Sequence, residues 1–246
     1  GFHGYIDTLM GINNNLKQKK LNKCSFKEKL TFKLKKMYHP TIKTPIKNSI
    51  NMNKNIIITG PNAAGKTTTI KATIINLLLT QQLGLGFFDK CQTSTFDYIH
   101  SYLNIPDSCS RDSLFQAEAR RCKDILDCIN KYPDKKHFCI FDELYSGTNP
   151  YEAISSAFSY LDYISKNPNV RFLLTTHFIK LCTLFEKKSK IINKSMKTME
   201  DQNKNPVYTY KITNGISTVK GGVSVLRNLD YPEDIIKMSL HVLENI

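Results

Sequence analysis

Several short runs along this chain contain almost no polar residues. The runs at residues 55–59 ("NIIIT"), 137–141 ("HFCIF") and 171–176 ("RFLLTT") are dense and apolar, which predicts strands buried on both faces. Residues 29–37 ("KLTFKLKKM") alternate instead, so we expect a half-exposed strand with its apolar side chains on one face. Two later strands are expected at residues 189–194 and 206–212.

Longer stretches between these runs place apolar side chains at helical spacing. Residues 1 to about 25 mix apolar and polar positions, which indicates a helix that leads into a basic turn. Asp112 or Ser113 is suited to cap the helix that follows it. Residues 196–206 are polar and are predicted to be a loop. The other predicted helices cover residues 65–82, 112–131, 150–165 and 232–246, the last with Pro232 at its start.

Strands that alternate with helices predict an α/β fold, with a mostly parallel sheet covered by helices on both faces. The 246 residues suffice for one substantial core with a small appendage. The longest apolar run, residues 73–79, is far too short to span a membrane and lies in a predicted helix, so we expect no membrane partner. Because the chain begins with Gly1 and shows no charged-then-apolar leader, we expect a piece of a longer protein.

Seven cysteines are spread along the chain without a Cys-x-x-Cys pair. An odd number with this spacing suits reduced thiols, so we expect an intracellular, reducing compartment, with nucleus and cytoplasm both open. The same spacing predicts no structural zinc. The cysteines are Cys24, Cys91, Cys109, Cys122, Cys128, Cys139 and Cys182.

The positive charge of the chain is concentrated near its start. The formal net charge is +14, and residues 17–54 hold twelve lysines against one acid, Glu28, which gives +11 in that segment. A basic stretch of this kind can follow a phosphate backbone. The alternative is a lysine bias of an AT-rich genome, and arginine, the preferred residue for bidentate phosphate contacts, is scarce.

A phosphate-binding loop follows the first dense apolar run. Two glycines with four residues between them precede Lys and Thr, and glycines let successive backbone N–H groups wrap a phosphate. The helix that starts near Gly65 adds the positive end of its dipole. Lys66 offers a mobile charge to the β- and γ-phosphates, and the Thr67 hydroxyl is a candidate Mg²⁺ ligand. The loop residues are Gly60, Pro61, Asn62, Ala63, Ala64, Gly65, Lys66 and Thr67.

Polar side chains also follow two later apolar runs. Asp142 and Glu143 end the "HFCIF" run, where Asp142 is expected to hold Mg²⁺ and Glu143 to orient the attacking water. We expect their strand to lie beside the strand of the phosphate loop. His177 follows "RFLLTT" at a strand end, where it can sense the γ-phosphate; a purely structural histidine is the alternative.

Together these motifs resemble the ATPase domain of the MutS family, the DNA mismatch-repair clamps, within the P-loop ATPases of ABC type. The resemblance begins near Tyr38 and runs to the end of the chain. "TGPNAAGKTT", which ends at Thr68, is similar to the family's Thr-Gly-Pro-Asn loop, and "DSLFQAEARRCKDIL" to its signature segment, aligning Ser113, Phe115 and Glu118. "FDELYSGTNP", "TTHF" and "YKITNGISTVKGGVSVLRNLDYPEDII" resemble its later motifs.

The resemblance implies an ATP- and Mg²⁺-dependent ATPase whose domains pack head to tail in a homo- or heterodimer. Ser113 would then reach the partner's γ-phosphate in trans, although a plain N-cap is the alternative. Tyr210 falls where the family stacks an aromatic ring on adenine, although a tyrosine packed on the sheet is equally expected. Residues 1–36 would be the stub of a lever helix with a basic linker, and residues 37–246 the ATPase domain. DNA would be contacted through domains missing from this chain.

Some positions depart from the family's pattern. Ala63-Ala64 replaces Met-Gly, which stiffens the phosphate loop. Tyr145-Ser146 and Asn149-Pro150 alter the loop after the acids, which normally contacts the other subunit. Pro45-Ile46 replaces an expected aromatic beside the adenine. Phe26-Lys27-Glu28 mimics the family's Phe-x-Glu mismatch wedge but stands just before the ATPase domain, so we take it as chance.

Three other functions compete with a hydrolysing motor. Transporter ATPases and chromosome-organising ATPases of the SMC type both require a Leu-Ser-Gly-Gly-Gln signature, which this chain lacks. The third is a nucleotide-gated module that dimerises with little turnover, which the altered loop at residues 145–150 favours.

Overall fold

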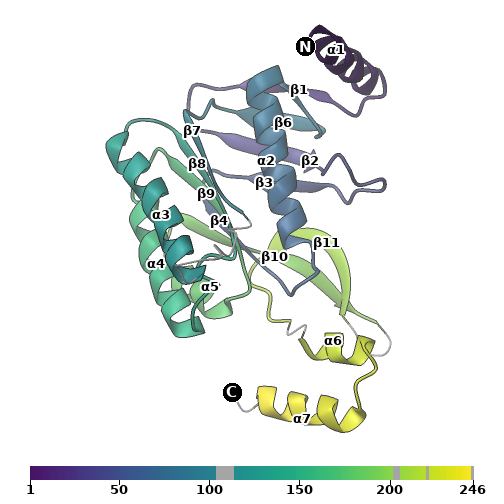
Figure 1. Ribbon diagram of the computed structural model, residues 1–246, viewed down its shortest axis with the longest axis vertical. Coiled ribbons are helices and arrows are strands. Elements are labelled where there is room, and N and C mark those ends of the chain that lie inside the picture. Colours follow the sequence, from purple (N-terminus) through teal and green to yellow (C-terminus); the bar gives the residue numbers. More distant parts are fainter. Residues whose placement is uncertain (104–113, 202–205, 220–221, 245–246) are drawn as a thin grey trace.

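The larger of the two β-sheets has six strands in the order β11-β10-β4-β9-β8-β7 (Figure 1). Neighbouring strands run parallel except for the antiparallel pair β10–β11. This computed structural model, which describes residues 1–103, 114–201, 206–219 and 222–244, therefore confirms the predicted α/β fold. The strands are β4 (Asn55–Thr59), β7 (Tyr98–Tyr102), β8 (His137–Asp142), β9 (Val170–Thr176), β10 (Ile191–Glu200) and β11 (Pro206–Asn214).

The smaller sheet has five strands in the order β3-β2-β6-β1-β5. Its strand β2 is the alternating segment predicted from the sequence, with Phe32, Leu34 and Met37 buried and the intervening lysines outside. Strand β1 pairs in parallel with β6, and all other neighbours are antiparallel. The strands are β1 (Asn22–Phe26), β2 (Phe32–Met37), β3 (Asn48–Asn51), β5 (Leu85–Gly86) and β6 (Lys90–Thr93).

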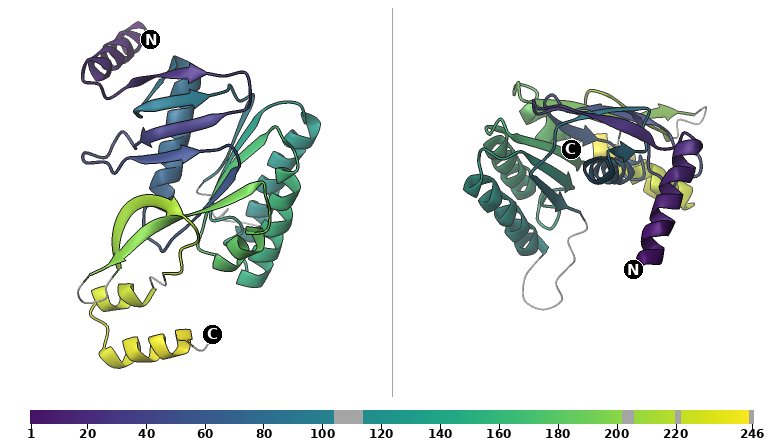
Figure 2. Two further views of the ribbon diagram at one scale, coloured as in Figure 1. Left: turned by 180° about the vertical axis from the view of Figure 1, so that it is seen from behind. Right: turned by 90° about the horizontal axis from the view of Figure 1, so that it is seen from above.

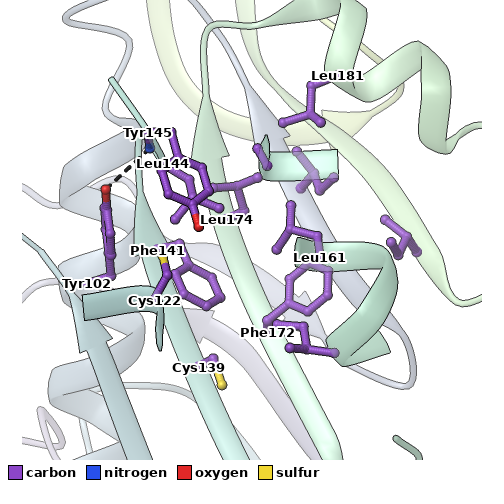
Figure 3. Packing of buried hydrophobic residues seen from close by; sticks show 14 of the residues in the cluster. Tyr102, Cys122, Cys139, Phe141, Leu144, Tyr145, Leu161, Phe172, Leu174 and Leu181 are labelled. Atoms are coloured by element: carbon purple, nitrogen blue, oxygen red, sulfur yellow. Dashed lines mark hydrogen bonds between the residues drawn. The ribbon is translucent and has the colours of Figure 1, made fainter. Parts of the chain in front are cut away.

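Alternate residues of the central strands β4, β8 and β9 enter two different hydrophobic cores, because successive side chains of a strand point to opposite faces. The first core lies under helices α3 (Leu114–Lys131), α4 (Pro150–Ser165) and α5 (Ile179–Phe185), and Figure 3 shows Phe141 and Phe172 within it. The second core lies between the two sheets, around helix α2 (Lys66–Leu83). Burial on both faces explains why these strands read as unbroken apolar runs.

Local signals fix the ends of the helices that carry the site. Helix α2 begins after Gly65 and ends at Gly84, and both glycines adopt left-handed φ values, of 93° and 68°. Helix α4 begins with a cap in which Asn149 Oδ1 accepts the backbone N–H of Glu152 at 3.0 Å, with Pro150 at the first helical position. The Asn-Pro pair thus starts a helix here.

The helices nearest the chain ends lie at opposite ends of the molecule (Figures 1 and 2). Helix α1 (Phe2–Lys17) buries none of its residues, while α6 (Gly222–Asn228) and α7 (Glu233–Glu244) follow the β10–β11 hairpin. None of the helices among the described residues is both long enough and apolar enough to cross a bilayer. The six cysteines in the described ranges are all free thiols.

Two expectations differ from the structure. The polar stretch predicted as a loop from Met196 is strand β10 as far as Glu200, because it pairs with β11 around a bulge. The predicted basic turn before residue 25 contains β1, whose partner β6 lies far along the chain. Strand β2 spans residues 36 and 37, between which the sequence proposed a division, and that division stays a proposal.

The first core predicts a large loss of stability on truncation of Phe172. Its ring is fully buried against Phe141, with ring centroids 6.3 Å apart, so Phe172→Ala should lower the free energy of unfolding by about 3–5 kcal/mol. The control is Phe26→Ala, which truncates a ring that is 47% exposed and should cost far less. Urea denaturation of both variants measures the difference, and equal losses would contradict the described packing.

Candidate functional site

The carboxyl ends of three parallel strands meet at one edge of the six-stranded sheet. Thr59 at the end of β4 pairs with Thr176 at the end of β9, and Asp142 at the end of β8 pairs with Thr175. The residues that follow these strand ends therefore emerge together. They are the phosphate loop, Glu143 and His177, the three pieces that the sequence singled out.

The order of the strands corrects one expectation. Strand β8 does not lie beside β4, because β9 lies between them. Asp142 nevertheless reaches the phosphate loop, because the first turn of α2 extends across the end of β9. Thr67 Oγ1 donates a hydrogen bond to Asp142 Oδ2 at 2.9 Å, and Thr175 Oγ1 of β9 donates to Oδ1.

A cavity of about 320 Å³ opens in front of the phosphate loop. Ala63 and Gly65 both adopt left-handed backbone conformations, with φ of 64° and 93°, which turn the loop sharply into α2. Ala64 packs its side chain into the core and donates its N–H to Pro61 O at 3.3 Å, while Gly60 packs against Met196. The cavity is lined by Pro61, Asn62, Ala63, Gly65, Lys66, Thr67, Thr68, Glu143 and Tyr210.

Lys66, Glu143 and His177 lie next to one another across the mouth of the loop. Lys66 Nζ lies 3.5 Å from Glu143 Oε1, and His177 Nδ1 lies 3.4 Å from Glu143 Oε2. The hydrogen bond from His177, together with the charge of Lys66, holds the pKa of Glu143 below its usual value despite partial burial. Glu143 is thus a carboxylate at neutral pH, ready to accept a proton from a water molecule.

Lys66 is held back against its own loop. Its side chain is 5% exposed, and Nζ donates to Gly60 O at 2.8 Å and to Pro61 O at 3.2 Å. Burial lowers the pKa of Lys66, and the charge of Glu143 opposes that shift. Both carbonyl contacts are exchangeable for phosphate oxygens, which are stronger acceptors because they carry charge.

A second cavity, of about 240 Å³, adjoins the loop at the start of α2. Tyr210 lines it from β11, where the bulge gives this residue a left-handed φ of 56°. Asn48 fixes the strand there, since its Nδ2 donates to Tyr210 O at 2.8 Å and its Oδ1 accepts from Ile212 N at 2.9 Å. Pro45 and Ile46 line the cavity from the β2–β3 connection. The size and apolar walls of this cavity suit a planar base.

Sequence reasoning gave no role to Glu118, which the structure places at the centre of a junction. Glu118 is only 2% exposed, and its carboxylate accepts hydrogen bonds from Ser146 N at 3.0 Å, Ser146 Oγ at 2.9 Å and Gly147 N at 3.0 Å. The loop after the acids is thereby tied to α3. A glutamate at the inner side of an amphipathic helix was the available signal.

The approach of that loop to α3 is close. A Cβ added to Gly147 would lie 2.7 Å from Leu114 Cγ and 2.8 Å from Phe115 N, so only glycine fits without a shift. The predicted trans contact Ser113, and Asp112 with it, lie outside the described residues. The close approach of Gly147 to Leu114 and Phe115 places the first turn of α3, which follows Ser113 in the chain, directly against the loop that begins at Glu143.

The chain is similar to known proteins along most of its length. The family described as MutS domain V matches residues 56–246. The DNA mismatch repair protein MutS of Persephonella marina is 28% identical over 98% of this chain and 28% of its own length. The endonuclease MutS2 of Staphylococcus aureus is 30% identical over 95% of this chain and 30% of its own length. The chain thus spans less than a third of these curated relatives.

The buried Glu118 junction predicts a measurable cost when it is removed. Glu118→Ala leaves three donors of the loop without their carboxylate, so it should lower the free energy of unfolding by about 2–4 kcal/mol. Asp127→Ala on the same helix removes only an exposed pair with Lys123, and should cost less than about 0.5 kcal/mol. Chemical denaturation compares the two, and similar small losses would show that the junction contributes little.

Proposed function

The chain belongs to the MutS family, and we propose that it is the ATP-binding and ATP-hydrolysing domain of a MutS-like DNA clamp. The convergence of Lys66, Thr67, Asp142, Glu143 and His177 at one sheet edge is the observation that carries this proposal. The proposed architecture is a P-loop ATPase of ABC type. Its sheet edge carries a loop for phosphates, a pair of acids and a histidine, which is the set that phosphoryl transfer to water requires.

The residues of the site fit ATP. We assign the triphosphate to the cavity at the phosphate loop and the adenine to the adjoining cavity, against Tyr210 and Ile46. Thr68 lies between them, since it lines both cavities. On binding, Lys66 exchanges its two loop carbonyls for phosphate oxygens. The Cβ of any residue replacing Gly65 would meet the Tyr210 ring at 3.1 Å, so a side chain there would narrow the passage.

Thr67 and Asp142 would hold Mg²⁺, because a hydroxyl and a carboxylate are the oxygen ligands this ion prefers. Their mutual hydrogen bond at 2.9 Å keeps both groups at the mouth of the loop. When bound, Mg²⁺ supplies positive charge that offsets the charge developing on the phosphate oxygens.

Glu143 is the proposed general base. Its lowered pKa keeps it ionised, and its left-handed backbone, with φ of 53°, directs the residue away from the strand that precedes it. His177 holds one carboxylate oxygen, and Lys66 lies near the other. This arrangement orients the carboxylate for a water molecule that attacks the γ-phosphate in line.

The proposal extends to assembly and DNA. By family membership, we infer a dimer that closes on ATP, with Ser113 completing the partner's site and DNA held by other parts of the longer protein. Proteins named for DNA mismatch repair and for endonuclease activity both occur among the relatives. Residues 1–36 remain the proposed connection toward those parts.

The rival proposal is a nucleotide-gated switch with little turnover. It draws on the loop after the acids, where Tyr145 has a left-handed φ of 59° and its N–H donates to the hydroxyl of Tyr102 at 3.3 Å. A loop held this firmly would transmit binding between subunits whether or not hydrolysis follows.

Substitution of Glu143 separates the two proposals. Glu143→Gln should retain ATP binding and lower the steady-state hydrolysis rate by about 10²-fold or more, because it removes the base and leaves the phosphate loop intact. Glu186→Gln, an exposed glutamate after α5, is the matched control and should hydrolyse at the wild-type rate. If wild type and Glu143→Gln bind ATP and hydrolyse it equally slowly, the enzyme proposal is lost and the switch remains.

A lysine-lined groove gives DNA a second, direct contact on this chain. The groove lies over the smaller sheet, on the side that Figure 2 (left) shows facing away from α2. Alternation along β2 points Lys33 and Lys35 out of the core toward it. The lysines that line it are Lys23, Lys33, Lys35, Lys90 and Lys194, with a single acid, Asp89.

Reversal of two groove charges tests this contact. The double variant Lys33→Glu/Lys35→Glu should weaken DNA binding at low salt and reduce the slope of log K against log salt by about 2. Lys123→Glu/Lys131→Glu on α3 makes the same change of charge elsewhere and should affect binding far less. Fluorescence anisotropy with a DNA duplex measures both, and identical salt slopes for the two variants would remove the groove from the proposal.

A further inference from the structure

Two histidines and a cysteine gather at the opposite end of strand β8 from the phosphate loop. His137 begins β8, five residues before Asp142 and so roughly 16 Å away along the strand. His100 comes from β7 and Cys128 from α3. A ring nitrogen of each histidine and the Cys128 Sγ all lie within 4.8 Å of one another.

The strand register explains why these side chains share a face. His100 pairs with Cys139, and Cys139 belongs to the core under α3. Because residues two apart on a strand point the same way, His137 also faces α3. Cys128, on α3, is half-buried, and its Sγ lies within 4.8 Å of a ring nitrogen of each histidine.

The hydrogen bonds at His137 leave one of its nitrogens free to act as an acceptor. His137 Nε2 lies 2.9 Å from Tyr132 O, and a carbonyl only accepts, so the ring proton is on Nε2. His137 Nδ1 therefore presents a lone pair, at 3.1 Å from His100 Nε2. Metal binding would replace this contact, with the His100 ring proton carried on Nδ1 and the Cys128 thiol proton released to solvent. A backbone carbonyl that fixes the tautomer of a histidine in this way is the usual outer partner of a metal-binding imidazole.

We propose that His100, Cys128 and His137 bind a zinc ion that fastens β7, β8 and α3 together. Two imidazoles and a thiolate are ligands that zinc prefers, with water as the fourth ligand. With zinc–nitrogen bonds of about 2.0–2.1 Å, a tetrahedral ion holds its two nitrogens about 3.3–3.4 Å apart. The spacing of 3.1 Å is thus already close, and the sulfur, which lies within 4.8 Å of both nitrogens, need approach by no more than about 1.3 Å.

Ring packing fixes the orientation of this site before any metal binds. The Tyr98 ring stacks on His137 with centroids 5.0 Å apart and on Tyr132 with centroids 5.3 Å apart. His137 is itself fully buried. Metal binding would therefore cost the ligand side chains little conformational freedom, which favours affinity. The sequence predicted no structural zinc because these ligands stand 28 and 9 residues apart, without the short spacing of a zinc motif.

In the fold, the proposed zinc ion would act as a clip, a cross-link between β7 and α3. His100 precedes and Cys128 follows the segment that contains Ser113, so one ion would join the strand before that segment to the helix after it. The clip would act on the sheet edge remote from the phosphate loop. Its effect should therefore appear as stability of β7 and α3 and not as a change at Lys66 or Glu143.

Metal titration of the chain without nucleotide, in excess Mg²⁺, tests the proposal. Co²⁺ as the probe should bind as a single ion per chain, with the strong ligand-field bands of a tetrahedral site and a thiolate-to-cobalt charge-transfer band, and Zn²⁺ should displace it. Cys128→Ser should abolish the charge-transfer band and weaken binding at least about tenfold. Cys24→Ser and His3→Asn remove a thiol and an imidazole elsewhere and should leave the spectrum unchanged.

A second measurement does not depend on variants that fold poorly. Zn²⁺ should protect Cys128 from alkylation by iodoacetamide in the wild-type chain, as peptide mass spectrometry detects, while leaving the rate at Cys24 unchanged. Zn²⁺ should also raise the melting temperature by several degrees. The proposal is overturned if the chain binds neither ion, if the cobalt spectrum lacks the thiolate band, or if Cys128→Ser and wild type titrate alike.

Discussion

The site depends on the hydrogen bonds that the Asp142 carboxylate accepts. This carboxylate accepts one hydrogen bond from Thr67, in the first turn of α2, and one from Thr175, in the neighbouring strand β9. Those two bonds connect the end of β8 to the phosphate loop across an intervening strand. Without them, the separation between Lys66 and Glu143 would depend on the packing of the strands and on the ion pair between these two residues alone.

The two cores supply the rigidity that this contact needs. Strands β4, β8 and β9 are packed on both faces, so their ends cannot shift independently. Close packing of this kind transmits displacement with little loss. The loop that begins at Glu143 is held in addition by hydrogen bonds to Glu118, so helix α3 helps to position the Glu143 carboxylate. The proposed head-to-tail dimer would act on the proposed hydrolysis through α3.

The sequence predicted most of the elements and the identity of the central residues, because those signals are local. Dense apolar runs marked β4, β8 and β9, and the glycines of the phosphate loop and the acids after β8 follow them directly. Long-range pairing was invisible. The place of β9 between β4 and β8, and the pairing of β1 with a strand 67 residues later, depend on tertiary packing. The left-handed backbone of Tyr210 has no local signature, and the burial of Glu118 was indicated only by its position on the inner side of an amphipathic helix.

The second cavity, beside the start of α2, is lined by residues that are distant in the chain. Asn48 belongs to the smaller sheet and Tyr210 to the hairpin of the larger one, and the hydrogen bonds between them close the cavity over α2. A ligand that binds only this assembled form stabilises the whole junction by mass action. The proposed nucleotide would thus hold the two sheets together. A substitution that weakens the contact between the sheets would lower nucleotide affinity, even where the substituted residue does not touch the nucleotide.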